Sequence, residues 1–233
     1  MDSKKTRASL FLVFIPFRNV KTLCRLLFVG QKVPFDPADY LAAFSRLAEG
    51  SPEYQGHGWG LAYQSVGAWH RHRDVRPIWE SEFPVLPPTK RLLVHARSAF
   101  RNEGITIDNN MPFLHENSAF AFNGELHGVR IKENGRIGAE KIFRYILRFR
   151  NGNPTNDIAK ATEIIRHRSE YVRAMNFILA NNEKSYISTY FNERREYFTL
   201  YFKEDQNGAM VCSAPLDSSK LWTPIPNDSL LVL

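Results

Sequence analysis

The order of hydrophobic and polar positions along the chain predicts strands near both ends and helices between them. A continuous apolar run at 24–30 (CRLLFVG) predicts a buried strand. The segment 36–50 predicts an amphipathic helix, with Asp36 as its N-cap, Pro37 at its first helical position and Gly50 after its last turn. The chain therefore begins its regular structure with a strand that leads into a helix.

The next part of the chain predicts four strands. Segments 59–65 and 68–73 read as a hairpin, because only two residues separate them. Segments 91–100 and 118–126 predict two further strands, and the polar loop that joins them, at 102–110, is rich in asparagine, aspartate and glycine. We expect the functional side chains on these strands.

Helical spacing then replaces the strand pattern. Apolar residues on one face predict a helix at 138–149, and a second helix carries the apolar positions between 158 and 165. The pattern returns to strands at 175–181, 185–191, 196–202, 210–215 and 229–233. This succession predicts one α+β domain in which two packed sheets lie between helices.

Composition agrees with a globular domain. The chain has 233 residues, of which 43% are hydrophobic and 24% charged, so it can bury a core without disulfides or metals. Its two cysteines, Cys24 and Cys212, lie far apart and form neither a disulfide framework nor a paired-cysteine zinc site. A reducing cytoplasm is the expected compartment. His70 and His72 lack a third ligand, so we expect no metal and no cofactor.

The net charge of +7 is concentrated near the start, where residues 1–22 carry five basic side chains and one acidic side chain. A basic segment followed by an apolar one has the outline of a secretory signal, but no small-x-small cleavage site follows and the apolar part is too short to cross a bilayer. A propeptide, a peripheral anchor and a gene start assigned too far upstream all remain open. The basic residues at 144–173 indicate a solvated helical face, so we expect no nucleic-acid binding.

Six motifs occur in an order that resembles class II glutamine amidotransferases, and especially the stand-alone members that lack a synthase domain. The motifs are CRLLFVG, GHGWGLAY, HARSAF, FAFNGELHG, GAEKIF and APLDSSKLWTPIPNDSLLVL. The resemblance implies an N-terminal-nucleophile hydrolase with a four-layer αββα sandwich. It divides the chain into an upstream extension, 1–23, and an amidotransferase domain, 24–233.

Under this resemblance Cys24 is the nucleophile. A cysteine that begins a chain carries its own base, because the pKa of an α-amino group lies near about 8. The thiol would attack the side-chain amide of glutamine or of a γ-glutamyl compound, releasing ammonia or an amine. Leu23 gives a route to this terminus, since a leucine codon such as TTG can start translation in prokaryotes; propeptide cleavage gives another. Without the motifs, a buried structural cysteine would be the preferred interpretation.

The other site residues are also assigned by the resemblance. Asn123 and Gly124 match the asparagine side chain and glycine N–H that bind the oxyanion, although the histidine that usually precedes them is replaced here by Phe122. Arg97 matches the arginine that holds the substrate carboxylate. The remaining pocket residues are His95 and Trp59, and for Trp59 a core position is an equal alternative.

The sequence departs from the family at Gly138. Members usually have an aspartate there, two residues before the glutamate that corresponds to Glu140, and it binds the α-ammonium of glutamine. Glu140 is retained as a substrate-binding residue. Either Glu103 or Asp108 from the polar loop replaces the missing carboxylate, or the substrate is a γ-glutamyl amide rather than free glutamine.

Two other classes of function stay open. The first is a catalytically silent relative that serves as a binding or regulatory module. The second is a basic protein that binds membranes or nucleic acid through residues 1–22, and loss of residues 1–23 would then remove any membrane association. For the enzyme, a separate synthase subunit that accepts the ammonia is the candidate protein partner.

Overall fold

The computed structural model describes residues 23–149 and 152–233, and the expectations for residues 1–22 lie outside this part of the chain. Two antiparallel sheets form its centre. One has seven strands in the order β11-β9-β10-β1-β4-β2-β3, and the other has five in the order β12-β8-β7-β6-β5. The strands are β1 (Arg25–Phe35), β2 (Trp59–Ser65), β3 (Ala68–Asp74), β4 (Thr89–Ala96), β5 (Phe113–His115), β6 (Ser118–His127), β7 (Tyr171–Ala180), β8 (Ser185–Thr189), β9 (Tyr201–Asp205), β10 (Gly208–Cys212), β11 (Thr223–Pro224) and β12 (Ser229–Val232).

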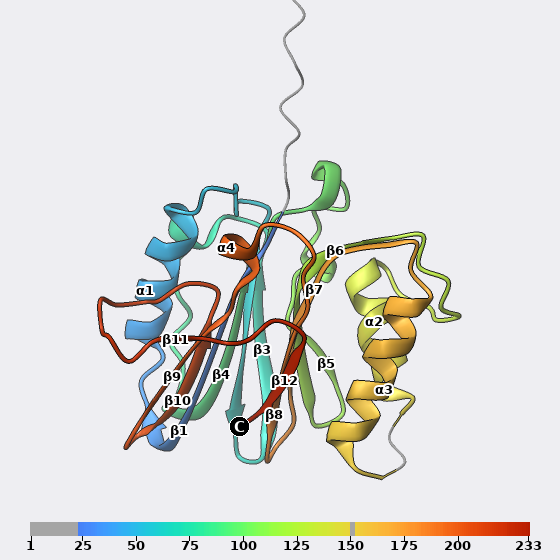
Figure 1. Cartoon of the computed structure of the whole chain (residues 1–233). Helices are drawn as coiled ribbons and strands as arrows, with labels where there is room; N and C mark the ends of the chain where they lie inside the picture. The colour runs from blue at the N-terminus through green and yellow to red at the C-terminus, as the bar shows by residue number, and fades with distance from the viewer. Residues whose placement is uncertain (1–22, 150–151) are drawn as a thin grey trace, which may run out of the picture.

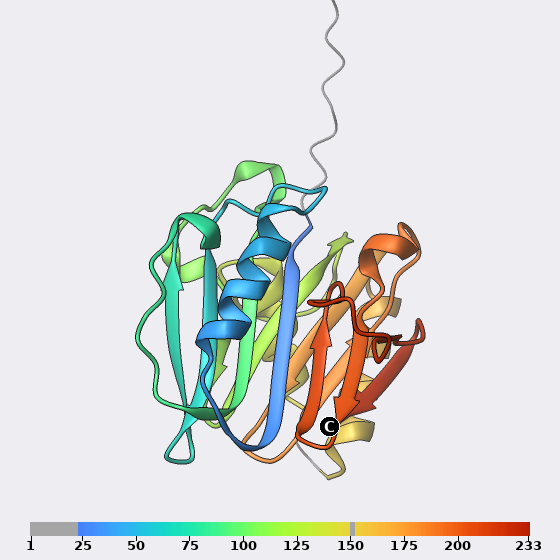
Figure 2. The ribbon, with the colours of Figure 1, turned by 90° about the vertical axis from the view of Figure 1, so that its left-hand side faces the viewer.

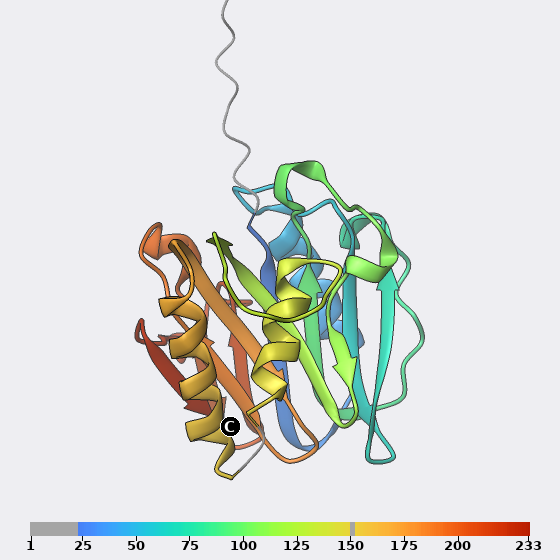
Figure 3. The same ribbon diagram turned by 90° about the vertical axis from the view of Figure 1, so that its right-hand side faces the viewer.

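Helices cover the outer faces of both sheets. They are α1 (Ala38–Glu49), α2 (Gly138–Leu147) and α3 (Pro154–His167). The short α4 (Arg195–Phe198) lies at one end of the sheets, and the 3₁₀ turns are η1 (Ile78–Glu80), η2 (Phe100–Asn102) and η3 (Ile107–Asn109). Figure 1 shows α1 outside the seven-stranded sheet and α2 and α3 outside the five-stranded sheet. Figures 2 and 3 show these two covered faces from the front.

Strand β1 explains why its sequence is continuously apolar. Leu26 and Phe28 face the five-stranded sheet and join the large core that contains Phe120, whereas Leu27 and Val29 pack on the opposite face beneath α1. All four side chains are buried, so both faces of the strand require apolar residues and the sequence shows no alternation of polar and apolar positions. The prediction of a buried strand at 24–30 is confirmed, and the strand continues to Phe35.

The helix predictions are confirmed with small changes in their ends. Helix α1 begins at Ala38, one residue after Pro37, and the Asp36 carboxylate accepts a hydrogen bond from the Ala38 N–H at 2.9 Å. Helix α3 begins at Pro154, and the Asn153 side chain accepts the Thr155 N–H at 2.9 Å as its N-cap.

The prediction of one strand at 196–202 is wrong. The segment forms α4 and then β9, with Arg194 in the left-handed region at φ 51° and the Thr199 hydroxyl donating to the Arg195 carbonyl at 2.7 Å. This turn buries Tyr197 and Phe198 together against Leu23, whereas a strand would direct the two rings to opposite faces. The aromatic content that favours a strand is therefore used to build a small cluster at the sheet end.

Several strand boundaries also differ from expectation. Strand β4 ends at Ala96, before the turn η2, and β10 ends at Cys212. The strands β5 and β11 were not predicted, since they contain three and two residues and are too short to show an alternating pattern. Among the described residues, no helix has the length and hydropathy needed to cross a membrane.

We expect Phe120→Ala to lower the free energy of unfolding by about 3 to 5 kcal/mol, because the substitution leaves a cavity between the five-stranded sheet and α2. The Phe120 ring is fully buried and lies 4.8 Å from the Phe143 ring and 5.5 Å from the Phe177 ring. Urea unfolding measures the change. Val33→Ala, at an exposed position of β1, is the control and should change the value by less than about 0.5 kcal/mol.

Candidate active site

The candidate site lies where β1 begins. Figure 1 shows the start of β1, the helix α4 and the loops that follow β4 at the same end of the two sheets. Cys24 directly precedes β1, and the pairing of Arg25 with Ala96 brings it beside the residues that follow β4. The backbone N–H of Cys24 donates to Asn123 Oδ1 at 2.9 Å, so the site joins the seven-stranded sheet to β6 of the five-stranded sheet.

The Cys24 thiol is partly exposed and contacts the backbone of Ser98. Its sulfur lies 3.7 Å from the Ser98 carbonyl oxygen and accepts the Ser98 N–H at 3.5 Å. Burial raises the pKa of the thiol, while the Ser98 backbone and the charge of Arg97 act in the opposite direction. With Leu23 attached, Cys24 has no α-amine, so its thiol is mainly protonated near neutral pH and needs a base before it can attack.

Asn123 is fully buried and uses only half of its side-chain amide. Its Oδ1 accepts from Cys24, and its Nδ2 has no hydrogen-bond partner in the described part of the chain. An unsatisfied buried donor typically costs about 1 to 3 kcal/mol, so it calls for an explanation. Gly124 follows, and a Cβ there would lie 2.2 Å from the Ala174 carbonyl oxygen. The strand therefore needs glycine at the second position of this pair.

Arg97 is a buried cation whose hydrogen bonds go to uncharged oxygens. Its guanidinium donates to the Gly104 carbonyl at 2.9 Å and to Asn110 Oδ1 at 3.3 Å. Burial lowers the pKa of Arg97, and the interaction with Cys24 raises it. A guanidinium near a thiol, held by neutral acceptors alone, is suited to an anionic group of a ligand.

His95 and Trp59 lie on opposite sides of the seven-stranded sheet. His95 pairs with Leu26 and Gly60 in the strand register and is fully buried, and this burial, with Arg97 nearby, lowers its pKa to about 3. The ring is therefore neutral, and it lies on the same side of the sheet as Leu26. Trp59 packs in the core beneath α1 and donates its indole N–H to Ser81 at 2.9 Å. For Trp59 the geometry supports the core alternative.

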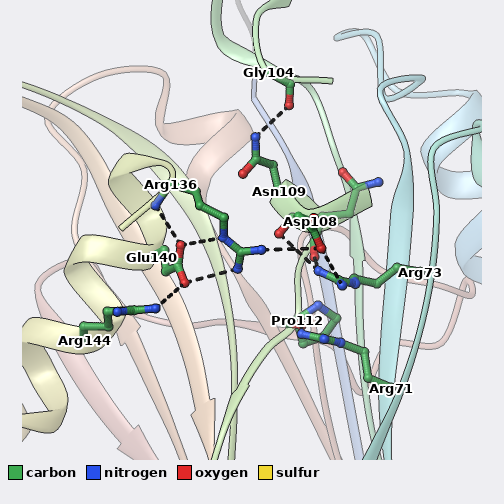
Figure 4. Close-up of polar contacts among 10 residues, drawn as sticks. Arg71, Arg73, Gly104, Asp108, Asn109, Pro112, Arg136, Glu140 and Arg144 are labelled. Carbon is green, nitrogen blue, oxygen red and sulfur yellow. Dashed lines mark hydrogen bonds and ion pairs between the residues drawn. The ribbon is translucent and has the colours of Figure 1, made fainter. Parts of the chain in front are cut away.

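The carboxylate of Glu140 is bound by two arginines. In the first turn of α2 it accepts hydrogen bonds from Arg136 at 2.8 Å and from Arg144 at 3.0 Å, as Figure 4 shows. Burial opposes its ionisation, but these hydrogen bonds outweigh burial and lower the pKa of Glu140 to about 2. Its carboxylate is committed to two arginines, so Glu140 positions α2 and the segment before it.

The two acids of the polar loop that could replace the carboxylate missing at Gly138 differ in their surroundings. Asp108 is paired with Arg73 at 3.2 Å and with Arg136 at 3.6 Å (Figure 4). The exposed Glu103 contributes its backbone carbonyl, which accepts from Arg97 at 3.5 Å. A Cβ at Gly138 would meet nothing within 4 Å, so the position has space that this chain leaves unfilled.

Three residues of the site were missed by the sequence analysis. Gln55 Nε2 and the Tyr197 hydroxyl donate to the carbonyl of Leu23 at 2.5 and 2.7 Å. His57 Nδ1 accepts the Ala99 N–H at 2.8 Å and fixes the turn after β4. Gln55 lies in a loop and Tyr197 in the segment predicted as a strand, so neither periodicity nor motif order identifies them. His57 lies within the motif GHGWGLAY, which is the signal that could have identified it. No group of three potential metal ligands occurs within residues 23–149 and 152–233.

Comparisons with known proteins identify the fold. No family model matches the sequence, and no curated protein matches it. A glutamine aminotransferase class-II domain protein from Silicibacter pomeroyi superposes with a TM-score of 0.61 at 16% identity, covering 90% of this chain and 94% of that one. A predicted glutamine amidotransferase from Pseudomonas aeruginosa gives 0.57 at 15%, covering 89% and 96%.

A larger protein contains the same fold as one of its parts. Glutamine phosphoribosylpyrophosphate amidotransferase from B. subtilis gives a TM-score of 0.57 at 14% identity, and the match covers 82% of this chain and 41% of that one. The chain thus has the fold of class II glutamine amidotransferase domains, and the resemblance noted in the sequence is confirmed at the level of the fold.

We expect Glu140→Gln to destabilise the fold by about 1 to 3 kcal/mol at pH 7, because two arginines lose their anionic partner. The pKa of Glu140 is lowered in the folded state from 4.5 to about 2, so its contribution is present above pH 4.5 and is lost as the pH falls through about 2. The difference between wild type and variant in urea unfolding should therefore shrink from pH 5 to pH 2. Glu163→Gln, at an exposed position of α3, is the control and should show no such trend.

Proposed function

We propose that this chain is a glutamine amidotransferase-type amidohydrolase that uses Cys24 as an N-terminal nucleophile. The observation that carries the proposal concerns the side-chain amide of Asn123. Its oxygen accepts a hydrogen bond from the Cys24 nitrogen, and its buried NH₂ group has no hydrogen-bond partner among the described residues. Asn123 can thus contact the Cys24 nitrogen, which is the proposed base, through its oxygen, and donate to the oxyanion of acyl transfer through its NH₂ group. The fold shared with class II amidotransferase domains supports the same reaction class.

We also propose where the catalytic domain begins and how its layers are arranged. Residues 24–233 form the catalytic domain, an αββα sandwich of the N-terminal-nucleophile type, and the working chain begins at Cys24 after loss of residues 1–23. In that form the Cys24 nitrogen is an amine instead of a peptide N–H, and it takes the thiol proton as the sulfur attacks the amide carbon.

Two donors then stabilise the negative oxygen of the tetrahedral intermediate. These are Asn123 Nδ2 and the Gly124 backbone N–H, and the stabilisation is electrostatic because both are fixed before the reaction. The C–N bond breaks as the protonated α-amine returns its proton to the departing nitrogen, which leaves as ammonia or an amine. A water molecule next attacks the thioester with the α-amine as base, releasing a carboxylic acid and restoring the thiol.

Arg97 supplies substrate binding in this mechanism. A substrate carboxylate would replace the neutral oxygens of Gly104 and Asn110 that now accept from its guanidinium, exchanging weaker acceptors for a charged one. His95 would line the pocket as a neutral ring. The substrate is glutamine or a γ-glutamyl amide. Both carry the same α-ammonium, so the pairing of Asp108 with two arginines applies to both alike.

A second candidate function is a catalytically silent binding or regulatory module. The observation that favours it is the burial of Leu23, which packs against Phe191 and Phe198 while its carbonyl accepts two hydrogen bonds. In that state the Cys24 nitrogen is part of a peptide bond and cannot act as a base. A separate synthase subunit that accepts ammonia is the candidate partner of the active form.

We expect Cys24→Ala to reduce release of ammonia from glutamine, or of amine from a γ-glutamyl amide, by at least about 1,000-fold, because the nucleophile is lost. Cys212→Ala is the matched control: this cysteine is buried beneath α1, so kcat/KM should stay within about twofold. The intact mass of the natively expressed protein should correspond to a chain that begins at Cys24. Unchanged release by Cys24→Ala would refute the proposal, and an ordinary alkylation rate of Cys24 would favour the silent module.

We expect Asn123→Asp to lower kcat by about 100-fold or more with little change in KM, because it keeps an acceptor for the Cys24 nitrogen but removes the oxyanion donor. Asn134→Ala, in an exposed loop, should leave both constants unchanged. Steady-state kinetics with the two variants measures the effect. A loss confined to KM would assign Asn123 to substrate binding instead.

A further inference from the structure

We propose that Gln55 and Tyr197 are positioning residues that hold the α-amino group of Cys24 in the working enzyme. The inference rests on the proposed function, in which Cys24 is the first residue of the chain. We refer to Gln55 and Tyr197 together as the amine cradle.

The amine cradle already converges on the peptide unit that contains the Cys24 nitrogen. Gln55 Nε2 lies 2.5 Å and the Tyr197 hydroxyl 2.7 Å from the Leu23 carbonyl oxygen, and the same hydroxyl lies 3.4 Å from the Cys24 carbonyl oxygen. The oxygen and nitrogen of one peptide unit are separated by only about 2.2 Å. When the Leu23 carbonyl is absent, both side chains therefore border the space into which the new amine extends.

The hydrogen-bonding capacity of the cradle matches what an amine requires. A terminal amine has two N–H donors as the neutral base and three as the ammonium that it becomes on taking the thiol proton, and Asn123 Oδ1 at 2.9 Å accepts one of them. The Tyr197 oxygen is a second acceptor. Gln55 Oε1 is a third, because it is buried without a hydrogen-bond partner within the described residues. A rotation of the Gln55 amide exchanges its nitrogen for this oxygen at the vacated site, so the orphaned acceptor gains a donor.

The surroundings favour the neutral amine, which is the form that acts as a base. Arg25 stacks 4.1 Å from the centre of the Tyr197 ring, and Arg194 lies 5.0 Å from it. Arg97 adds a third positive charge near Cys24, while the carboxylate of Glu53 is paired with Arg194. Like charges and burial both disfavour an ammonium.

Tyr197 stays protonated and neutral while it holds the amine. Burial is the main reason that its pKa is raised to about 12. Its hydroxyl can therefore donate to a carbonyl or accept from an amine without changing charge. The apolar side chains around Leu23, which include Phe191 and Phe198, would shield this contact from water.

The experiment uses protein whose mass shows Cys24 as its first residue, with Tyr197→Phe and Gln55→Leu compared with wild type. Tyr197→Phe keeps the ring on which Arg25 stacks, so folding should be preserved and is verified by thermal unfolding. We expect kcat to fall by about 10-fold or more with KM nearly unchanged, and the acidic limb of the kcat–pH profile to move. Tyr186→Phe and Gln64→Leu, on β8 and β2, are the matched controls and should keep the wild-type profile.

A second measurement does not depend on turnover. The rate at which chloroacetamide alkylates Cys24 is followed by mass between pH 5 and 9, because the neutral amine assists removal of the thiol proton. The cradle predicts that Tyr197→Phe and Gln55→Leu shift this profile relative to wild type and to the two controls. Wild-type profiles in both variants would overturn the inference. Absence of amide hydrolysis by wild type would instead defeat the proposed function, and the alkylation profiles would still decide whether the cradle controls the amine.

Discussion

The hydrogen bond from the Cys24 nitrogen to Asn123 is the contact on which the site depends, because its two residues belong to different sheets. Its length of 2.9 Å requires the sheets to keep a fixed separation and register. The core between them, to which Leu26 and Phe28 of β1 contribute, provides that separation by close packing. Core residues remote from the chemistry therefore set the distance between the candidate nucleophile and the candidate oxyanion donor.

The pairing of β6 with β7 also connects the site to α4. Asn123 pairs with Asn176 in the neighbouring strand, and the Asn176 side chain donates to the Phe198 carbonyl at 2.6 Å and accepts the Tyr190 N–H at 3.0 Å. These bonds fix the short helix at the end of the sheet, where Tyr197 reaches Leu23. Two buried asparagines side by side thus connect the oxyanion position to the residues around the start of the chain.

Much of the fold could be predicted because α1 follows the helical period and the central strands, such as β1 and β4, are short apolar runs. The fold brings together site residues that motifs identify, such as Cys24 and Asn123. Trp59 is not part of this group, because its side chain points to the α1 side of the sheet, whereas successive residues of a strand point to opposite sides. Tyr197 could not be found from its sequence: its position depends on a left-handed turn at Arg194 that local aromatic content does not indicate. Residues that are positioned by turns and tertiary contacts cannot be identified from the periodicity of the sequence.

The charges around the site divide into paired and unpaired sets, and this division bears on the substrate. Glu140 and Asp108 are each bound by two arginines, with Arg136 shared between them, so this network joins α2 to the polar loop. Arg97, by contrast, is buried against neutral oxygens. A ligand that enters therefore meets an available positive charge, whereas Glu140 and Asp108 are already neutralised. In the proposed function, glutamine and a γ-glutamyl amide would meet this arrangement in the same way, with the carboxylate bound by Arg97 and the α-ammonium extending towards water.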